Sequence, residues 1–186
     1  MVEWYVMLFP AARTPRRYAR LAQRWAAAVG GVVNPDPHVT IAYLVGPAEP
    51  AAVVAAMRAL PADPVMVEAD GALSYSQTPH ALFGYSASLR VLKTPELGSL
   101  HRAVLAGVRQ LGLTSLYVWE DVDPHLQVLR QLPAPPPQFL PRLAALHAHY
   151  RFTATHLVLS RPDGGGGYPV ELSRRLRPGR PTSRVV

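Results

Sequence analysis

The sequence of 186 residues contains no cysteine. This absence excludes disulfide bonds, thiolate nucleophiles, iron–sulfur clusters and cysteine-ligated zinc. The sequence also lacks a run of about 18 apolar residues that could cross a membrane as a helix. It starts Met1-Val2-Glu3, with an acidic residue where a secretory signal carries basic ones. We therefore expect a soluble cytoplasmic protein without a membrane partner, whose chemistry depends on histidine, carboxylate, hydroxyl or guanidinium groups.

Lysine is almost absent too, because Lys93 is the only lysine among the 19 basic residues. The formal net charge is +7 and the isoelectric point is near 10.2. Guanidinium groups bind phosphate oxygens in two-point contacts, and a positive field attracts polyanions. The composition therefore favours a nucleic acid or a nucleotide as the partner, although a GC-rich genome would produce the same arginine bias.

Hydrophobic residues make up 49% of the chain and charged residues 17%, a balance typical of a packed globule. The length fits one domain. From Arg177 onward the sequence is rich in proline, glycine and arginine and lacks apolar periodicity. We expect one domain of two closely packed lobes over residues 1–176, followed by a flexible tail over residues 177–186.

Apolar periodicity and turn residues divide the chain into short strands and helices. The predicted helices cover residues 16–29, 51–60, 97–111 and 135–149. The predicted strands cover residues 4–9, 39–45, 65–73, 81–91, 116–119, 126–129, 151–159 and 168–172. This mixture predicts an α+β fold with antiparallel strand pairs, among them a final hairpin that turns at residues 163–167.

One short motif occurs twice: Asp36-Pro37-His38 is echoed, 87 residues later, by Asp123-Pro124-His125. Each copy continues with apolar and polar residues in alternation. Each is preceded by a helix that ends in glycine, and each is followed by a proline, a helix and an antiparallel hairpin. This order indicates an internal duplication. It predicts a bilobal molecule with pseudo-two-fold symmetry, in which helices lie outside antiparallel sheets and a cleft runs between the lobes.

Strand alternation places His38 and Thr40 on one face, and His125 and Gln127 on one face of the second strand. If a pseudo-two-fold axis relates the lobes, both imidazoles converge on the cleft. Two imidazoles form a general acid–base pair, which displacement at phosphorus requires. Thr40 and Gln127 can then donate hydrogen bonds to non-bridging phosphate oxygens. This chemistry needs no metal and no other cofactor.

The first motif, residues 38–44 with the sequence His-Val-Thr-Ile-Ala-Tyr-Leu, resembles the first signature of the two-histidine (2H) phosphoesterases, in particular the bacterial 2′-5′ RNA ligase branch. Residues 125–130 resemble the second signature, including an arginine five residues after the histidine. The resemblance covers roughly residues 3–176. It implies a bilobal α+β fold, His38 and His125 as catalysts, and activity on RNA 2′,3′-cyclic phosphate ends or 2′-5′ linkages without a metal.

Arg130 is a candidate phosphate ligand on the strength of this resemblance. Strict alternation places its side chain on the face opposite His125, so this role requires the strand to bend or end first. A solvated position at the rim of the cleft is the alternative reading. The sequence also leaves open which histidine acts as acid and which as base.

Gln127 is a departure from the family pattern, which has threonine or serine at this position. The sequence leaves three hypotheses about function open. The first is a monomeric phosphoesterase acting on RNA with a cyclic phosphate end. The second is an RNA-binding module that lost turnover through Gln127, and the third is an enzyme of the same superfamily acting on a small cyclic nucleotide.

The remaining polar and aromatic residues have plainer interpretations. Asp36 and Asp123 fit ordinary turns before strands, although they could also orient the histidines. The histidines outside the two motifs have no recognisable partner, so structural or surface roles are expected. Most strand aromatics pack in cores, but five are candidate stacking platforms for a base. These five are Tyr43, Tyr75, Phe83, Tyr85 and Trp119.

Overall fold

The computed structural model describes residues 2–10, 16–60, 62–75, 84–132, 139–146, 149–162 and 168–177. Within these residues the strands form one curled sheet in the order β10-β9-β1-β3-β7-β5-β4-β8, and every pairing along it is antiparallel. The strands are β1 (Val2–Phe9), β2 (Val32–Val33), β3 (Val39–Gly46), β4 (Val65–Tyr75), β5 (Tyr85–Val91), β6 (Thr114–Ser115), β7 (His125–Leu132), β8 (Tyr150–Ala154), β9 (His156–Ser160) and β10 (Val170–Arg175).

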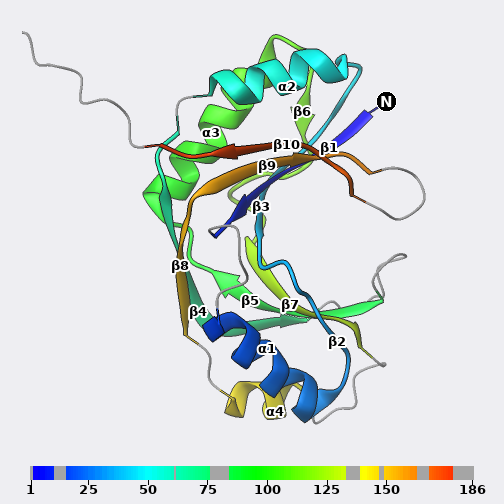
Figure 1. The fold of residues 1–186 in the computed structure, drawn as a ribbon, viewed down its shortest axis with the longest axis vertical. Coiled ribbons are helices and arrows are strands. Elements are labelled where there is room, and N and C mark those ends of the chain that lie inside the picture. The colour runs from blue at the N-terminus through cyan, green and yellow to red at the C-terminus, as the bar shows by residue number, and fades with distance from the viewer. Residues whose placement is uncertain are drawn as a thin grey trace, which may run out of the picture.

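The helices lie at the two ends of the molecule, outside the sheet (Figure 1). Helices α2 (Pro50–Ala59) and α3 (Pro95–Arg109) pack together at one end, and α1 (Arg16–Val29) packs with α4 (Phe139–Ala145) at the other. The antiparallel α+β architecture with outer helices is confirmed.

Local sequence explains where the helices begin and end. In α1, Tyr18, Ala22 and Trp25 recur at helical spacing and are fully buried. The helix ends at Gly30, whose φ of 79° suits glycine and whose N–H bonds the carbonyl of Ala26. The predicted bounds of this helix are confirmed at both ends.

The order of elements occurs twice, as β1-α1-β2-β3-α2-β4 and again as β5-α3-β6-β7-α4-β8. The two series meet where β3 pairs with β7, at Val39 and Leu126, each directly after one of the two motif histidines. The short strands exchange partners across this junction, because β2 pairs with β7 and β6 pairs with β3. This repetition supports the internal duplication, which itself stays a prediction.

Some of the predicted elements differ from the structure. The strand expected at 116–119 is wrong: the strand is β6, and the chain then turns, with the N–H groups of Asp121 and Val122 bonded to the carbonyl of Val118. The helix expected over 135–149 covers only α4 within the described residues, and residues 133–138 and 147–148 lie outside them. Tyr150, the residue directly after the expected helix, is the first residue of β8 and pairs with Ala69 on β4.

The single strand expected over 151–159 is two strands, β8 and β9, divided at Thr155. The N–H of Thr155 bonds the carbonyl of Phe9, and its carbonyl accepts from Leu176. At this point the chain stops pairing with β4 and starts pairing with β1. Strand β9 pairs with β10 as the expected final hairpin, whose glycine turn lies outside the described residues.

Candidate active site

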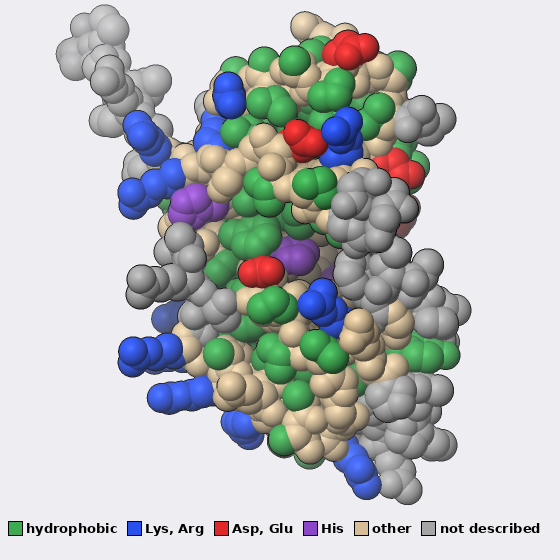
Figure 2. Space-filling view, turned by 45° about the vertical axis from the view of Figure 1, so that its right-hand side comes forward, with side chains coloured by type: hydrophobic (Ala, Val, Ile, Leu, Met, Phe, Trp, Pro, Cys, Tyr) green, Lys and Arg blue, Asp and Glu red, His purple; other side chains and the backbone are tan. Residues whose placement is uncertain are grey.

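The five residues singled out in the sequence line one cleft with a volume of about 650 Å³. They are His38, Thr40, His125, Gln127 and Arg130. Figure 2 shows histidine side chains in a recess at the middle of one face of the molecule. The pairing of Val39 with Leu126 brings the two motifs side by side, so the polar residues that flank this pair share one face of the sheet. The convergence expected from strand alternation is confirmed as geometry.

His38 lies half-buried directly before β3. Its Nδ1 lies 2.8 Å from the carbonyl oxygen of Asp36, and its ring stacks on Phe9 with 5.2 Å between centroids. A carbonyl can only accept, so Nδ1 carries the hydrogen and the neutral ring keeps a lone pair on Nε2. Burial lowers the pKa of His38, and the nearby charge of His125 lowers it further against the opposing bond to Asp36. His38 is therefore neutral at neutral pH.

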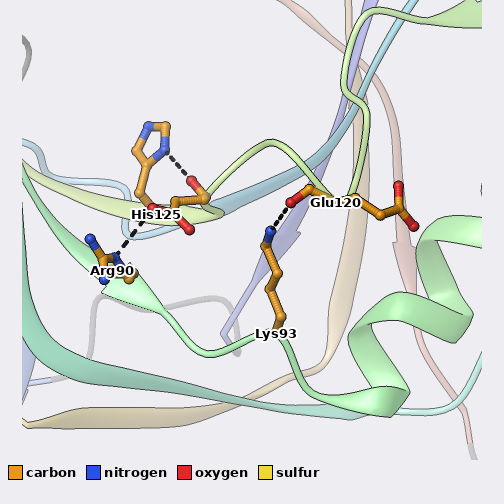
Figure 3. Close-up of polar contacts among 5 residues, drawn as sticks. Arg90, Lys93, Glu120 and His125 are labelled. Carbon is orange, nitrogen blue, oxygen red and sulfur yellow. Dashed lines mark hydrogen bonds and ion pairs between the residues drawn. The ribbon is translucent and has the colours of Figure 1, made fainter.

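His125 repeats the same backbone contact in a different setting. Its Nδ1 lies 3.3 Å from the carbonyl oxygen of Asp123, the residue that corresponds to Asp36 in the first motif. The imidazole is exposed, and the Asp123 carboxylate is held by Nε of Arg90 at 3.3 Å (Figure 3). Asp123 therefore touches His125 through its carbonyl and Arg90 through its side chain.

Residues at and just after the end of β5 hold the turn that precedes His125. Lys93 donates a hydrogen bond of 2.9 Å to the carbonyl of Glu120 (Figure 3). The N–H of Val91 bonds the carbonyl of Pro124 at 2.8 Å. These bonds hold the approach to β7 in place, and so they set the direction from which His125 enters the cleft.

Arg130 reaches the cleft because β7 contains a bulge. Gln127 pairs with Ser88 and Leu129 pairs with Ala87, so Val128 is an extra residue without a partner on β5. The extra residue shifts the alternation by one position. Arg130 therefore faces the cleft with Gln127, and the bend that its predicted position required is present.

A buried network supports the backbone of this strand. The hydroxyl of Tyr18 lies 2.9 Å from the carbonyl oxygen of Gln127 and 3.0 Å from that of Asn34. The Asn34 amide also donates to the Gln127 carbonyl at 3.2 Å, and its side-chain oxygen accepts from the N–H of Asp36. Burial raises the pKa of Tyr18, so its hydroxyl stays a donor. The network ties the loop before His38 to the strand after His125.

Sequence reasoning missed Tyr18 and Asn34 as supports for the site. Tyr18 belongs to the apolar stripe of α1 and carries no separate signal. Asn34 precedes a proline and an aspartate, which indicates a turn and nothing more. Only the fold brings Tyr18 within reach of a residue 109 positions later in the chain.

Tyrosines form one wall of the cleft. The tyrosines that line the cleft are not among the stacking candidates from the sequence. Tyr5, Tyr117 and Tyr168 line it. Tyr43 lies behind them, stacked on Tyr5 with 4.6 Å between centroids, and Tyr5 meets Tyr168 edge-on at 5.1 Å. Burial raises the pKa of Tyr168 to about 12 and also raises that of Tyr5. The wall is therefore uncharged at neutral pH and does not repel a phosphate.

The other aromatic candidates lie elsewhere. Tyr85 packs against the core, and Trp119 stacks on His101 with 5.0 Å between centroids. The Tyr75 side chain and Phe83 lie outside the described residues. His101 is 3% exposed and its Nδ1 lies 2.7 Å from the carbonyl of Ile41, so the structural role expected for it is confirmed and a partner that the sequence did not reveal is identified.

Two features are not found within the described residues. No group of three or more histidine, aspartate or glutamate side chains is arranged to hold a metal ion there. Likewise, none of the helices that the structure describes has the length and apolar character needed to span a membrane.

The family model of the 2′-5′ RNA ligase superfamily matches residues 14–166. The chain belongs to this superfamily, the 2H phosphoesterases, as its two motifs indicated. Membership indicates a phosphoesterase or a 2′-5′ ligase kind of enzyme. No curated protein sequence matches the chain.

Solved structures share the fold over nearly the whole chain. The protein TT0787 of Thermus thermophilus is 17% identical, with a TM-score of 0.58 over 96% of this chain and 100% of its own. LigT of E. coli complexed with 3′-AMP is 14% identical, with a TM-score of 0.53 over 94% and 97%. Usb1 of Kluyveromyces marxianus is 14% identical, with a TM-score of 0.55 over 94% and 98%. At these identities the likeness establishes the fold.

Proposed function

We propose that the protein is a metal-independent phosphoesterase that opens 2′,3′-cyclic phosphate ends of RNA by two-histidine acid–base catalysis. One observation carries the proposal: two imidazoles line one cleft, and each has Nδ1 tied to the carbonyl two residues before it. Because Nδ1 of each ring is engaged in this contact, Nε2 is the ring atom that is available for proton transfer. Relatives of this fold include LigT, whose structure holds 3′-AMP.

The different surroundings of the two histidines support a division of roles between them. His38 has a lowered pKa and supplies a neutral base, whereas the mechanism needs His125 to start protonated. Nε2 of His38 takes a proton from a water molecule as the water oxygen bonds to phosphorus. The bond from phosphorus to the 3′ oxygen breaks, and Nε2–H of His125 protonates that oxygen. The products are a 2′-phosphate and a 3′ hydroxyl, and proton exchange with solvent resets both imidazoles.

The remaining cleft residues bind the phosphoryl group and the base. Thr40 and Gln127 face the same side as the histidines and donate to the non-bridging oxygens, where negative charge accumulates. Arg130 supplies the positive charge that the bulge directs into the cleft. The wall made by Tyr5, Tyr117 and Tyr168 offers flat faces on which a base stacks.

The same machinery joins RNA ends when the 5′ hydroxyl of a second strand takes the place of water. The hydroxyl oxygen bonds to phosphorus, the 3′ oxygen departs, and a 2′-5′ linkage results. Cleavage of that linkage runs the step backwards, with the two histidines in exchanged roles. The cytoplasmic location and the monomeric state expected from the sequence remain predictions.

An assay with EDTA tests the proposal. Purified protein is incubated with 2′,3′-cyclic mononucleotides and with RNA oligomers ending in a cyclic phosphate, and the products are identified. We expect turnover in EDTA with a 2′-phosphate product. Binding of the oligomers without turnover of any cyclic phosphate would instead support an RNA-binding module, and turnover confined to mononucleotides would support an enzyme of small cyclic nucleotides.

A further inference from the structure

A second concave surface, the arginine groove, lies between the C-terminal end of α2 and strand β10. Its volume is about 740 Å³. Among the residues that the structure describes, four guanidinium groups line it, against one carboxylate, that of Asp63. The arginines are Arg58, Arg174, Arg175 and Arg177. A concave site with this excess of positive charge concentrates anions, and guanidinium forks match phosphate geometry.

The arginine groove adjoins the cleft that holds the histidines. Ser173 on β10 lines both. The strand register shows a second connection, because His156 on β9 pairs with Phe9 on one side and with Arg175 on the other. Paired residues of antiparallel strands share a face, and the Phe9 ring stacks on His38. A row of side chains therefore runs from His38 through Phe9 and His156 to Arg175.

The row crosses from β3 to β10 over three strand spacings, which amount to about 14 Å. The phosphate that meets His38 cannot reach Arg175 over this distance. Any phosphate held by Arg175 is a different one. Phe9 and His156 are half-buried and Arg175 is exposed, so each of these side chains keeps solvent-accessible surface that a ligand can contact.

Arg174 holds the arginine groove together. Its Nη1 donates a hydrogen bond of 2.7 Å to the carbonyl of Arg58, which joins β10 to the end of α2. The side chain is half-buried, and burial lowers the pKa of Arg174. A bound anion stabilises the charged form of a guanidinium that has lost part of its hydration. Its position thus favours an anion in the groove.

We propose that the arginine groove binds a second phosphate of the same RNA strand, so that the substrate class is a single-stranded oligonucleotide rather than a mononucleotide. This inference rests on the proposed function. A cyclic phosphate closes the 3′ end of a strand, so further nucleotides are attached only on its 5′ side. The groove therefore receives a phosphate upstream of the reacting one, and the row from Phe9 to Arg175 follows the intervening nucleotides.

The test compares kcat/KM for an RNA oligomer ending in a 2′,3′-cyclic phosphate with kcat/KM for the 2′,3′-cyclic mononucleotide, which has no upstream phosphate. The variants are Arg175→Gln and Arg58→Gln. The control is Arg142→Gln, which removes an exposed arginine from α4 at the opposite end of the molecule (Figure 1). All three remove one positive charge, so a change in net charge alone affects them equally.

We expect the ratio of the oligomer value to the mononucleotide value to fall about fivefold in Arg175→Gln and in Arg58→Gln, as loss of one charge-assisted contact predicts. The salt dependence of oligomer binding should become less steep by about 0.7 in a plot of log K against log salt. The ratio should stay constant in Arg142→Gln. An equal ratio in all three variants would overturn the proposal.

Binding separates failure of the groove from failure of the proposed function. Fluorescence anisotropy of a labelled RNA oligomer is measured on the same variants, whether or not any cyclic phosphate is hydrolysed. Weaker binding in Arg175→Gln and Arg58→Gln, with no turnover by the parent protein, would support the groove and refute the phosphoesterase. Turnover by the parent protein, with oligomer binding unchanged in both variants, would refute the groove alone.

Discussion

Phe9 and Arg90 lie beside the two histidines in corresponding places, and they give them opposite surroundings. Phe9 stacks on His38 across a distance of 5.2 Å, whereas Arg90 pairs with His125 in the register of β5 and β7 and binds Asp123. The apolar ring withdraws His38 from water. Next to His125, by contrast, lies the exposed ion pair of Arg90 and Asp123. Two copies of one motif thereby become chemically different groups.

The pH profile of kcat/KM should report the influence of Phe9. Because the pKa of His38 is lowered, the base stays deprotonated below the usual value of about 6.5, and the acid limb lies at lower pH than for an ordinary histidine. Phe9→Ala admits water to His38 and should move this limb upward in pH. Phe9→Tyr keeps a ring in place and should leave it where it is. If the acid limb of Phe9→Ala lies at the same pH as that of the parent protein, Phe9 does not lower the pKa of His38.

Thr40 should contribute to the rate rather than to the fold. It is half-buried in the cleft beside the histidines. Thr40→Ala removes one donor to the phosphoryl oxygens, and we expect kcat to fall about 100-fold. Thr40→Ser keeps the hydroxyl and should recover most of the rate. Equal rates for the two variants would mean that the hydroxyl does not contact the reacting group.

Tyr18 should stabilise both the fold and the site. Tyr18→Phe leaves the buried carbonyls of Asn34 and Gln127 without this donor, so the free energy of unfolding should fall by about 1–2 kcal/mol. Tyr150→Phe is a matched control, since the Tyr150 ring is 5.8 Å from that of Tyr18 and its buried hydroxyl has no hydrogen-bond partner within the described residues. Denaturant unfolding of both variants measures the difference. An equal loss of unfolding free energy in the two variants would show that the hydrogen bonds of Tyr18 do not stabilise the fold.

The sequence predicted the parts of this molecule that depend on local pattern. The bounds of α1 follow from the spacing of Tyr18, Ala22 and Trp25, and the histidines follow from strand alternation after each Asp-Pro-His. Each of these features depends on a few consecutive residues. The curled sheet then needs only the pairing of Val39 with Leu126 to bring both motifs into one cleft.

Features that depend on distant partners could not be predicted. The bulge at Val128 arises from the register against β5, and no residue type marks it, so the orientation of Arg130 stayed open. Tyr5 and Tyr168 are 163 positions apart in the sequence and meet only because β1 and β10 both flank β9. The division at Thr155 likewise reflects a change of neighbour from β4 to β1.

The most direct test of the account is the combined effect of removing both imidazoles. Hydrolysis of an RNA oligomer ending in a 2′,3′-cyclic phosphate is followed in EDTA by ³¹P NMR for the parent protein, His38→Asn, His125→Asn and the double variant. Because the two groups act on one phosphorus atom as a unit, each single variant should lose more than about 100-fold in kcat, and the double variant should be little slower than the slower single one. Full activity in either single variant, or losses that multiply in the double variant, would contradict the claim.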